Sequence, residues 1–133
     1  MSENLDTVSR YYRAFAEQDV PAALALQHDD FVSTQADSVP WCGVYRGAQG
    51  VSELFACVGG YLSSAEFEVE ELIEQGERVV AIGTARVTVR GTGETFVVRE
   101  VHALTLREGR LAAIEVFLNA PVAMLKALIV PAA

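Results

Sequence analysis

Hydrophobic and polar residues follow a helical period in the first half of the chain and a strand period in the second half. Near the N-terminus, apolar residues recur at spacings of three and four, at Leu5, Val8, Tyr12 and Phe15. This spacing predicts an amphipathic helix with one apolar face. A second, shorter helix is expected after Asp19, which can cap it, with Pro21 in its first turn.

Three more elements are expected before the period changes. The segment 28–33 predicts a short strand, and residues 34–47 are typical of a loop because they contain a proline and two glycines. A third helix is predicted by apolar residues that again recur at helical spacing: Val51, Leu54, Phe55, Val58 and Leu62.

The second half alternates apolar and polar residues with a period of two, which predicts four strands. Their expected ranges are 67–73, 78–90, 95–107 and 110–118. The connections carry Gly76, Gly91-Thr92-Gly93 and Glu108-Gly109, which are typical of hairpin turns. A last helix is expected from Pro121. Helices that mostly come first, followed by antiparallel strands, indicate an α+β fold and not a parallel βαβ fold.

The last predicted hairpin allows the two faces of the sheet to be assigned. If Glu108-Gly109 is a two-residue turn, Arg107 pairs with Arg110, and counting back places His102 opposite Glu115. Side chains alternate between the faces of a sheet. One face is therefore expected to carry a polar cluster beside Phe117, made of Glu100, His102, Glu115 and Asn119.

The opposite face of this hairpin is almost wholly apolar, so both faces need cover. The helices can cover one face. Because a large exposed apolar patch is unusual on a monomer, we expect a homodimer through the outer sheet face. A one-residue bulge would exchange the two sets of side chains locally.

His102, assisted by Glu115 or Glu100, is the predicted catalytic group. Histidine can remove or return a proton near neutral pH, and a carboxylate across the strand pair would orient it. The structural alternative is a satisfied polar pair in a wet cavity. Ligand contacts are expected from Tyr11 at the edge of the apolar face of the first helix, from Trp41 at the pocket mouth, and from Phe117 and Asn119. Asn119 could instead cap the last helix, and Trp41 could instead pack its loop onto the sheet.

Composition narrows the range of partners. The 133 residues fit one domain, 1–133, and carry a net charge of −8, which disfavours nucleic acid and anionic membranes. The two cysteines form no zinc or disulfide pattern, and no metal triad or phosphate-binding loop is visible. No cofactor and no metal are expected. The N-terminus lacks the pattern of a secretory signal, which favours a cytoplasmic protein.

The order of motifs resembles that of a known family. "GVYRG" precedes the third helix, "GERVV" opens a strand, and a histidine precedes "TLREGR". With the element order, these resemble the SnoaL-like, ketosteroid-isomerase-related branch of the NTF2-like superfamily. The resemblance implies an NTF2-like conical barrel, in which a strongly bent antiparallel sheet wraps around the N-terminal helices and leaves a deep pocket. It also implies dimers through the outer sheet face.

The resemblance implies several activities, because the superfamily holds isomerases, polyketide cyclases, hydratases and non-catalytic binders. Counted from Asp19, the base position of the ketosteroid isomerases falls on Gln35 and their oxyanion tyrosine on Tyr11. Ketosteroid isomerisation proper is therefore not expected. We expect a cofactor-independent isomerase, cyclase or hydratase that moves a proton next to a carbonyl of a mostly apolar substrate. The alternatives are a non-catalytic ligand-binding dimer, which Asn119 and Gln35 favour, and a purely structural interaction module.

Overall fold

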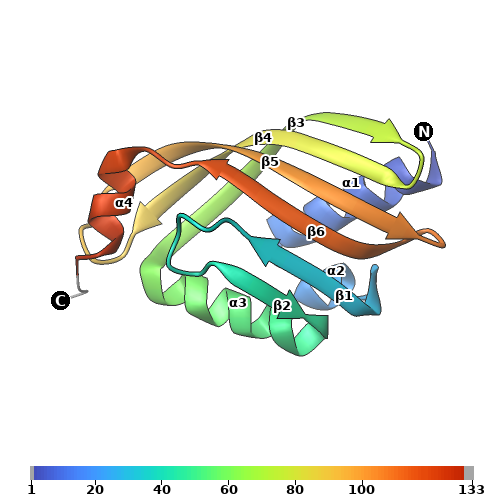
Figure 1. Cartoon of the computed structure of the whole chain (residues 1–133), viewed down its shortest axis with the longest axis horizontal. Coiled ribbons are helices and arrows are strands. Elements are labelled where there is room, and N and C mark those ends of the chain that lie inside the picture. Colours follow the sequence, from blue (N-terminus) through green and yellow to red (C-terminus); the bar gives the residue numbers. More distant parts are fainter. Residues whose placement is uncertain (1, 131–133) are drawn as a thin grey trace.

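The computed structural model describes residues 2–130 and shows four helices and six strands (Figure 1). The helices are α1 Glu3–Ala16, α2 Val20–Leu24, α3 Gly47–Tyr61 and α4 Val122–Leu128. The strands are β1 Gln27–Gln35, β2 Gly43–Arg46, β3 Leu62–Gln75, β4 Arg78–Val89, β5 Thr95–Arg107 and β6 Arg110–Asn119. The predicted α+β class is confirmed, and the segment expected as a loop contains the additional short strand β2.

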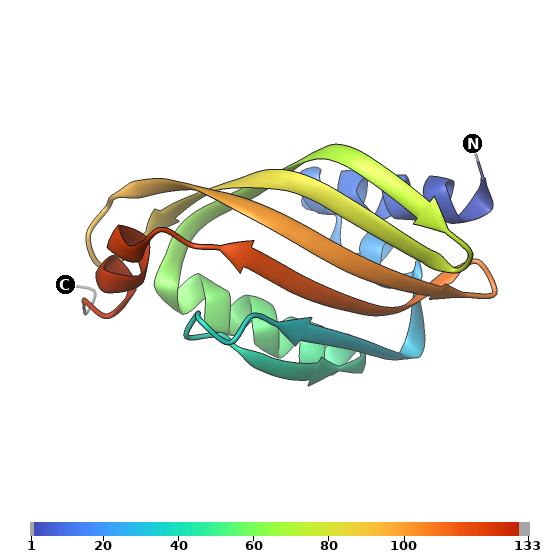
Figure 2. The same cartoon turned by 45° about the horizontal axis from the view of Figure 1, so that its top comes forward.

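The six strands form one sheet in the order β2-β1-β6-β5-β4-β3. Neighbouring strands are antiparallel except for β1 and β6, which run parallel, so the sheet is mixed rather than wholly antiparallel. Figures 1 and 2 show the long strands β3 to β6 crossing the molecule, with α1 near one end and α3 beside β1 and β2. Side chains of α1 and α3 pack on the same sheet face as Leu104, which we call the inner face.

The turn between β5 and β6 has the expected geometry. Glu108 and Gly109 both have positive φ angles, of 53° and 75°, as a two-residue hairpin turn requires. Arg107 pairs with Arg110, as predicted. Glycine suits this turn because it adopts a positive φ without steric cost.

The register predicted beyond this turn is wrong, because β6 contains a bulge at Ala112. Leu106 pairs with Leu111, but Thr105 pairs with Ala113, so one residue of β6 is left over. The bulge shifts every later pair by one position. His102 therefore lies opposite Val116 and not opposite Glu115.

The bulge exchanges the faces of all later β6 side chains. The inner face receives the aliphatic residues Ile114, Val116 and Leu118, whereas the outer face receives Glu115, Phe117 and Asn119. Without the bulge, a carboxylate and an amide would be buried and these three aliphatic side chains would be exposed, and burying polar groups without partners is costly. In this arrangement the aromatic ring of Phe117 lies on the outer face and remains 51% exposed.

The inner face is filled by two hydrophobic clusters. One lies under α1 and includes Val8, Leu104 and Leu111, and the other lies between α3 and α4 and includes Leu54 and Met124. The middle of β5 lies where these clusters meet, since Leu118 beside it packs against both of them. This junction holds the polar residues described next.

Candidate active site

His102 lies on the inner face in the middle of β5, and both of its ring nitrogens are hydrogen-bonded. The Tyr12 hydroxyl from α1 is 2.7 Å from Nδ1, and a Glu100 carboxylate oxygen from the same strand is 2.8 Å from Nε2. His102 is only 7% exposed, and the side chain of Glu100 is 15% exposed. We call Tyr12, Phe67, Glu100 and His102 the His102 cluster.

The hydrogen bonds define the tautomer of the neutral imidazole. An ionised carboxylate only accepts hydrogen bonds. With a neutral imidazole, the hydrogen therefore lies on Nε2, and this N–H donates a hydrogen bond to Glu100. Nδ1 then accepts from the Tyr12 hydroxyl. The result is a chain from the tyrosine through the imidazole to the carboxylate, which is a geometry suited to moving a proton.

Phe67 of β3 holds the imidazole ring from one side. Its ring is stacked on His102 with 4.3 Å between centroids and an interplanar angle of 23°. The Tyr12 ring also packs against Phe67, at 5.6 Å. Aromatic rings at these distances attract each other and exclude water. The imidazole is therefore oriented by packing as well as by its two hydrogen bonds.

Gly83 of β4 makes room for this stack. A Cβ atom at position 83 would lie 2.7 Å from Phe67 Cζ and closer still to the carbonyl oxygen of Glu68. Any larger residue would push the Phe67 ring or the β3 backbone away. The glycine in the middle of this strand thus serves a close approach, which is a common reason for glycine in a strand.

The surroundings keep the Tyr12 hydroxyl protonated. Burial raises the pKa of Tyr12 well above its ordinary value, and the nearby Tyr11 and Glu100 raise it further. Tyr12 is therefore a neutral hydroxyl at physiological pH, able to donate to His102 while its oxygen keeps a lone pair for a ligand.

The structure brings together two of the three predicted catalytic residues. Of the two carboxylates considered, Glu100 is the one that hydrogen-bonds His102. Glu115 is exposed on the outer face opposite Ala103. Phe117 and Asn119, predicted as ligand contacts, also lie on the outer face because of the bulge.

Both tyrosines of the first helix pack in the core, and it is Tyr12 that also reaches His102. Tyr11 was the predicted pocket donor, but it is buried in the core, where its hydroxyl accepts a 2.6 Å hydrogen bond from Gln27. Tyr12, predicted to be core, reaches His102. The sequence did indicate this position of Tyr12. Tyr12 belongs to the apolar face of the first helix, and that face packs against the inner face of the sheet.

Trp41 is packed in the core, and Asn119, together with Phe117, lines a hollow of about 280 Å³ on the outer face of the sheet. Trp41 is buried in the cluster between α3 and α4 and packs 6.2 Å from the Tyr61 ring, so it packs its loop onto the core. The alternative role of Asn119 as a helix cap is also not seen. Pro121 occupies the cap position of α4, and among the described residues no side chain caps that helix.

Within residues 2–130, no group of three or more His, Cys, Asp or Glu side chains is arranged to hold a metal ion. The same part of the chain contains no helix of the length and apolarity needed to cross a bilayer.

Comparison with known proteins gives matches to a family and to solved structures. A family model described as a SnoaL-like domain matches residues 8–114. An NTF2-like protein of unknown function from Burkholderia pseudomallei is 29% identical, with a TM-score of 0.88 over 97% of this chain and 99% of that one. TerC, co-crystallised with polyporic acid, is 28% identical, with a TM-score of 0.86 over 96% and 98% of the two chains. A search of curated proteins gives no significant match.

Proposed function

The chain belongs to the SnoaL-like family of the NTF2-like superfamily, and from this premise we propose that it catalyses proton transfer next to a carbonyl group of a mostly apolar small molecule. The observation that supports this proposal is the hydrogen-bonded chain from Tyr12 through His102 to Glu100 on the inner face. Two hydrogen bonds join a hydroxyl, an imidazole and a carboxylate, which are the groups that such a transfer requires.

The direction of proton movement follows from the hydrogen bonds. The Tyr12 oxygen would accept a proton from the substrate while its own proton passes to Nδ1 of His102. The resulting imidazolium is stabilised by Glu100 at 2.8 Å. When the proton returns to another atom of the substrate, the imidazole of His102 is neutral again and Tyr12 has regained its proton. In this scheme, isomerisation returns the proton to another carbon of the substrate. Aldol-type cyclisation forms a carbon–carbon bond to a second carbonyl, whose oxygen receives the proton, and dehydration breaks a carbon–oxygen bond, with the proton leaving in water.

Aromatic side chains near the cluster favour an aromatic substrate. Phe15, on the α1 face next to Tyr12, contacts Phe55 of α3 at 5.4 Å, and Phe55 remains 41% exposed. Exposed aromatic rings beside a polar group can stack on a planar ligand. TerC was co-crystallised with polyporic acid, which supports a small-molecule ligand for this chain.

A second candidate function, ligand binding without catalysis, is favoured by one observation. Both nitrogens of His102 are already occupied, and the ring is nearly buried. If a ligand contacts only the Tyr12 hydroxyl and the Glu100 carboxylate, the cluster would recognise a polar group and move no proton.

Hydrogen–deuterium exchange separates the two candidates. We would incubate the protein in D₂O with small aromatic ketones such as 2-tetralone and 1-indanone, and follow exchange of the α-hydrogens by NMR. Catalysis predicts faster exchange with the wild-type chain, reduced about 10²- to 10⁴-fold in His102→Ala and reduced in Tyr12→Phe. Saturable binding without any acceleration would support the second candidate and refute the first.

We also propose that a second copy of the chain covers the outer face. Val97, Val101 and Phe117 are 52%, 37% and 51% exposed there, on neighbouring strands. Val101 and Phe117 are directly paired, and the charged residues Arg99 and Glu115 lie two positions to either side of this pair. A two-fold axis through the Val101–Phe117 pair would therefore bring Arg99 of one copy over Glu115 of the other, so the face is complementary to itself.

A further inference from the structure

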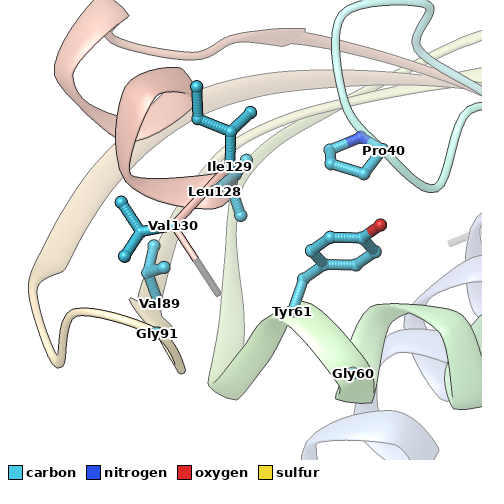
Figure 3. Close-up of a pocket in the computed structure, with 8 residues that line it drawn as sticks. All are labelled: Pro40, Gly60, Tyr61, Val89, Gly91, Leu128, Ile129 and Val130. Atoms are coloured by element: carbon cyan, nitrogen blue, oxygen red, sulfur yellow. The ribbon is translucent and has the colours of Figure 1, made fainter. Parts of the chain in front are cut away.

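A cavity of about 360 Å³ lies at the end of the sheet where β4, α3 and α4 all end (Figure 3). Its lining comes from four separate segments: Pro40, Gly60, Tyr61, Val89, Gly91, Leu128, Ile129 and Val130. Figure 3 shows the Tyr61 ring between Gly60 of α3 and Pro40, with Leu128 of α4 and the residues that follow it on the opposite side. Apart from the Tyr61 hydroxyl, the side chains in this wall are apolar.

Gly60 is a feature that the fold does not require. Glycine in a helix costs about 1 kcal/mol relative to alanine. Gly60 has no positive φ angle, and a Cβ atom there would meet nothing within 4 Å. Neither backbone conformation nor close packing therefore explains the glycine. Gly60 lies in the cavity wall with open space around its Cα, so a larger side chain at this position is expected to narrow the cavity.

The size and lining of the cavity define the ligand that it fits. An apolar cavity of about 150 Å³ is enough to hold benzene, so this cavity has room for two fused rings. The Tyr61 hydroxyl offers one hydrogen bond, and its ring is supported by Trp41 at 6.2 Å. We propose that this cavity binds a small, flat, mostly apolar molecule with one hydrogen-bonding group, which Tyr61 contacts, and that Gly60 keeps the space open.

This site is separate from the one proposed for proton transfer. The eight lining residues include none of the His102 cluster. The two proposals therefore fail independently: substitution of His102 tests the proton transfer, and substitution of Gly60 tests the cavity.

The test uses 2-naphthol as the probe, because it has two fused rings and one hydroxyl. Binding to the ¹⁵N,¹³C-labelled full chain would be followed by NMR. The proposal predicts saturable shifts of Val89 and Leu128, and affinity at least about tenfold weaker in Gly60→Leu. Gly59→Leu is the matched control, because Gly59 lies in the same helix, also has open space around it and does not line the cavity.

Unfolding cannot account for the expected loss, because leucine is a better helix former than glycine and both variants should be at least as stable as the wild type. Tyr61→Phe should weaken 2-naphthol binding but leave naphthalene binding unchanged. The proposal is overturned if 2-naphthol does not bind saturably, if its shifts fall elsewhere, or if Gly60→Leu and Gly59→Leu bind it equally well.

Discussion

Replacement of Tyr12 by phenylalanine removes one hydroxyl from the His102 cluster and keeps the ring that packs on Phe67. In the wild type this hydroxyl donates a 2.7 Å hydrogen bond to Nδ1 of His102. His102 is 7% exposed, so water has little access to the nitrogen that loses its partner. A buried polar atom left without a partner costs about 1–3 kcal/mol. For a domain of this size that corresponds to a melting temperature lower by roughly 3–10 °C.

The stability change can be measured by urea unfolding at a fixed protein concentration, so that any self-association is held constant. Tyr61→Phe is a suitable control, because Tyr61 is partly exposed and a substitution there should change the free energy of unfolding by less than about 0.5 kcal/mol.

Imidazole NMR gives an independent readout, because the chain has only two histidines. The ¹⁵N spectrum of the neutral ring should show His102 protonated at Nε2, with Nδ1 as a hydrogen-bonded acceptor. In Tyr12→Phe the Nδ1 resonance should move to the position of a free acceptor. Unchanged stability together with an unchanged Nδ1 resonance would refute the arrangement of Tyr12 and His102 described above.

Three further predictions concern other parts of the molecule. Phe117→Glu on the outer face should convert the proposed dimer to a monomer in light scattering, and a wild-type chain that is already monomeric would contradict the dimer. Gly83→Ala should lower the free energy of unfolding by about 1–3 kcal/mol, because the added Cβ would be too close to the Phe67 ring. An unchanged urea unfolding curve would show that Phe67 can move without a loss of stability. The hydrogen bond from Arg99 holds the pKa of Glu70 below its ordinary value, with a further contribution from the Thr84 hydroxyl. Any stabilisation by this exposed pair is therefore present above the ordinary glutamate pKa and lost as the pH falls through the lowered one. Arg99→Met should raise the pKa of Glu70 in a carboxyl ¹³C titration, and an unchanged pKa would show that the guanidinium is not the cause.

The fold could be predicted largely from the sequence because its helices and strands have strong periodicity. The apolar spacing from Leu5 to Phe15 predicted α1, and the pair Glu108-Gly109 predicted the turn of the last hairpin, where the structure shows positive φ angles at both residues. The strand β2 was missed because four residues, Gly43–Arg46, are too few to show a period. The parallel pairing of β1 with β6 joins segments far apart in the chain, which no local pattern records.

The candidate site could be predicted only in part, because one extra residue in β6 decides which side chains share a face. Glu100 and His102 are on the same strand, two residues apart, so their common face does not depend on any register. Glu115 and Asn119 were assigned to that face by counting residues across the hairpin. The bulge at Ala112 shifts the register by one residue and places both side chains on the opposite face. The aliphatic residues of β6 carried a signal for the bulge, since Leu111 and Ile114 can both point inward only if a residue is inserted between them.

The central claim is that Glu100, and not Glu115, is the acidic partner of His102 in proton transfer. The most direct measurement is the rate of α-hydrogen exchange in a bound aromatic ketone, compared between Glu100→Gln and Glu115→Gln. Both substitutions remove one negative charge, from opposite faces of the sheet. The structure predicts a rate at least about tenfold lower in Glu100→Gln and an unchanged rate in Glu115→Gln. Equal rates in the two variants, or a larger loss in Glu115→Gln, would contradict it.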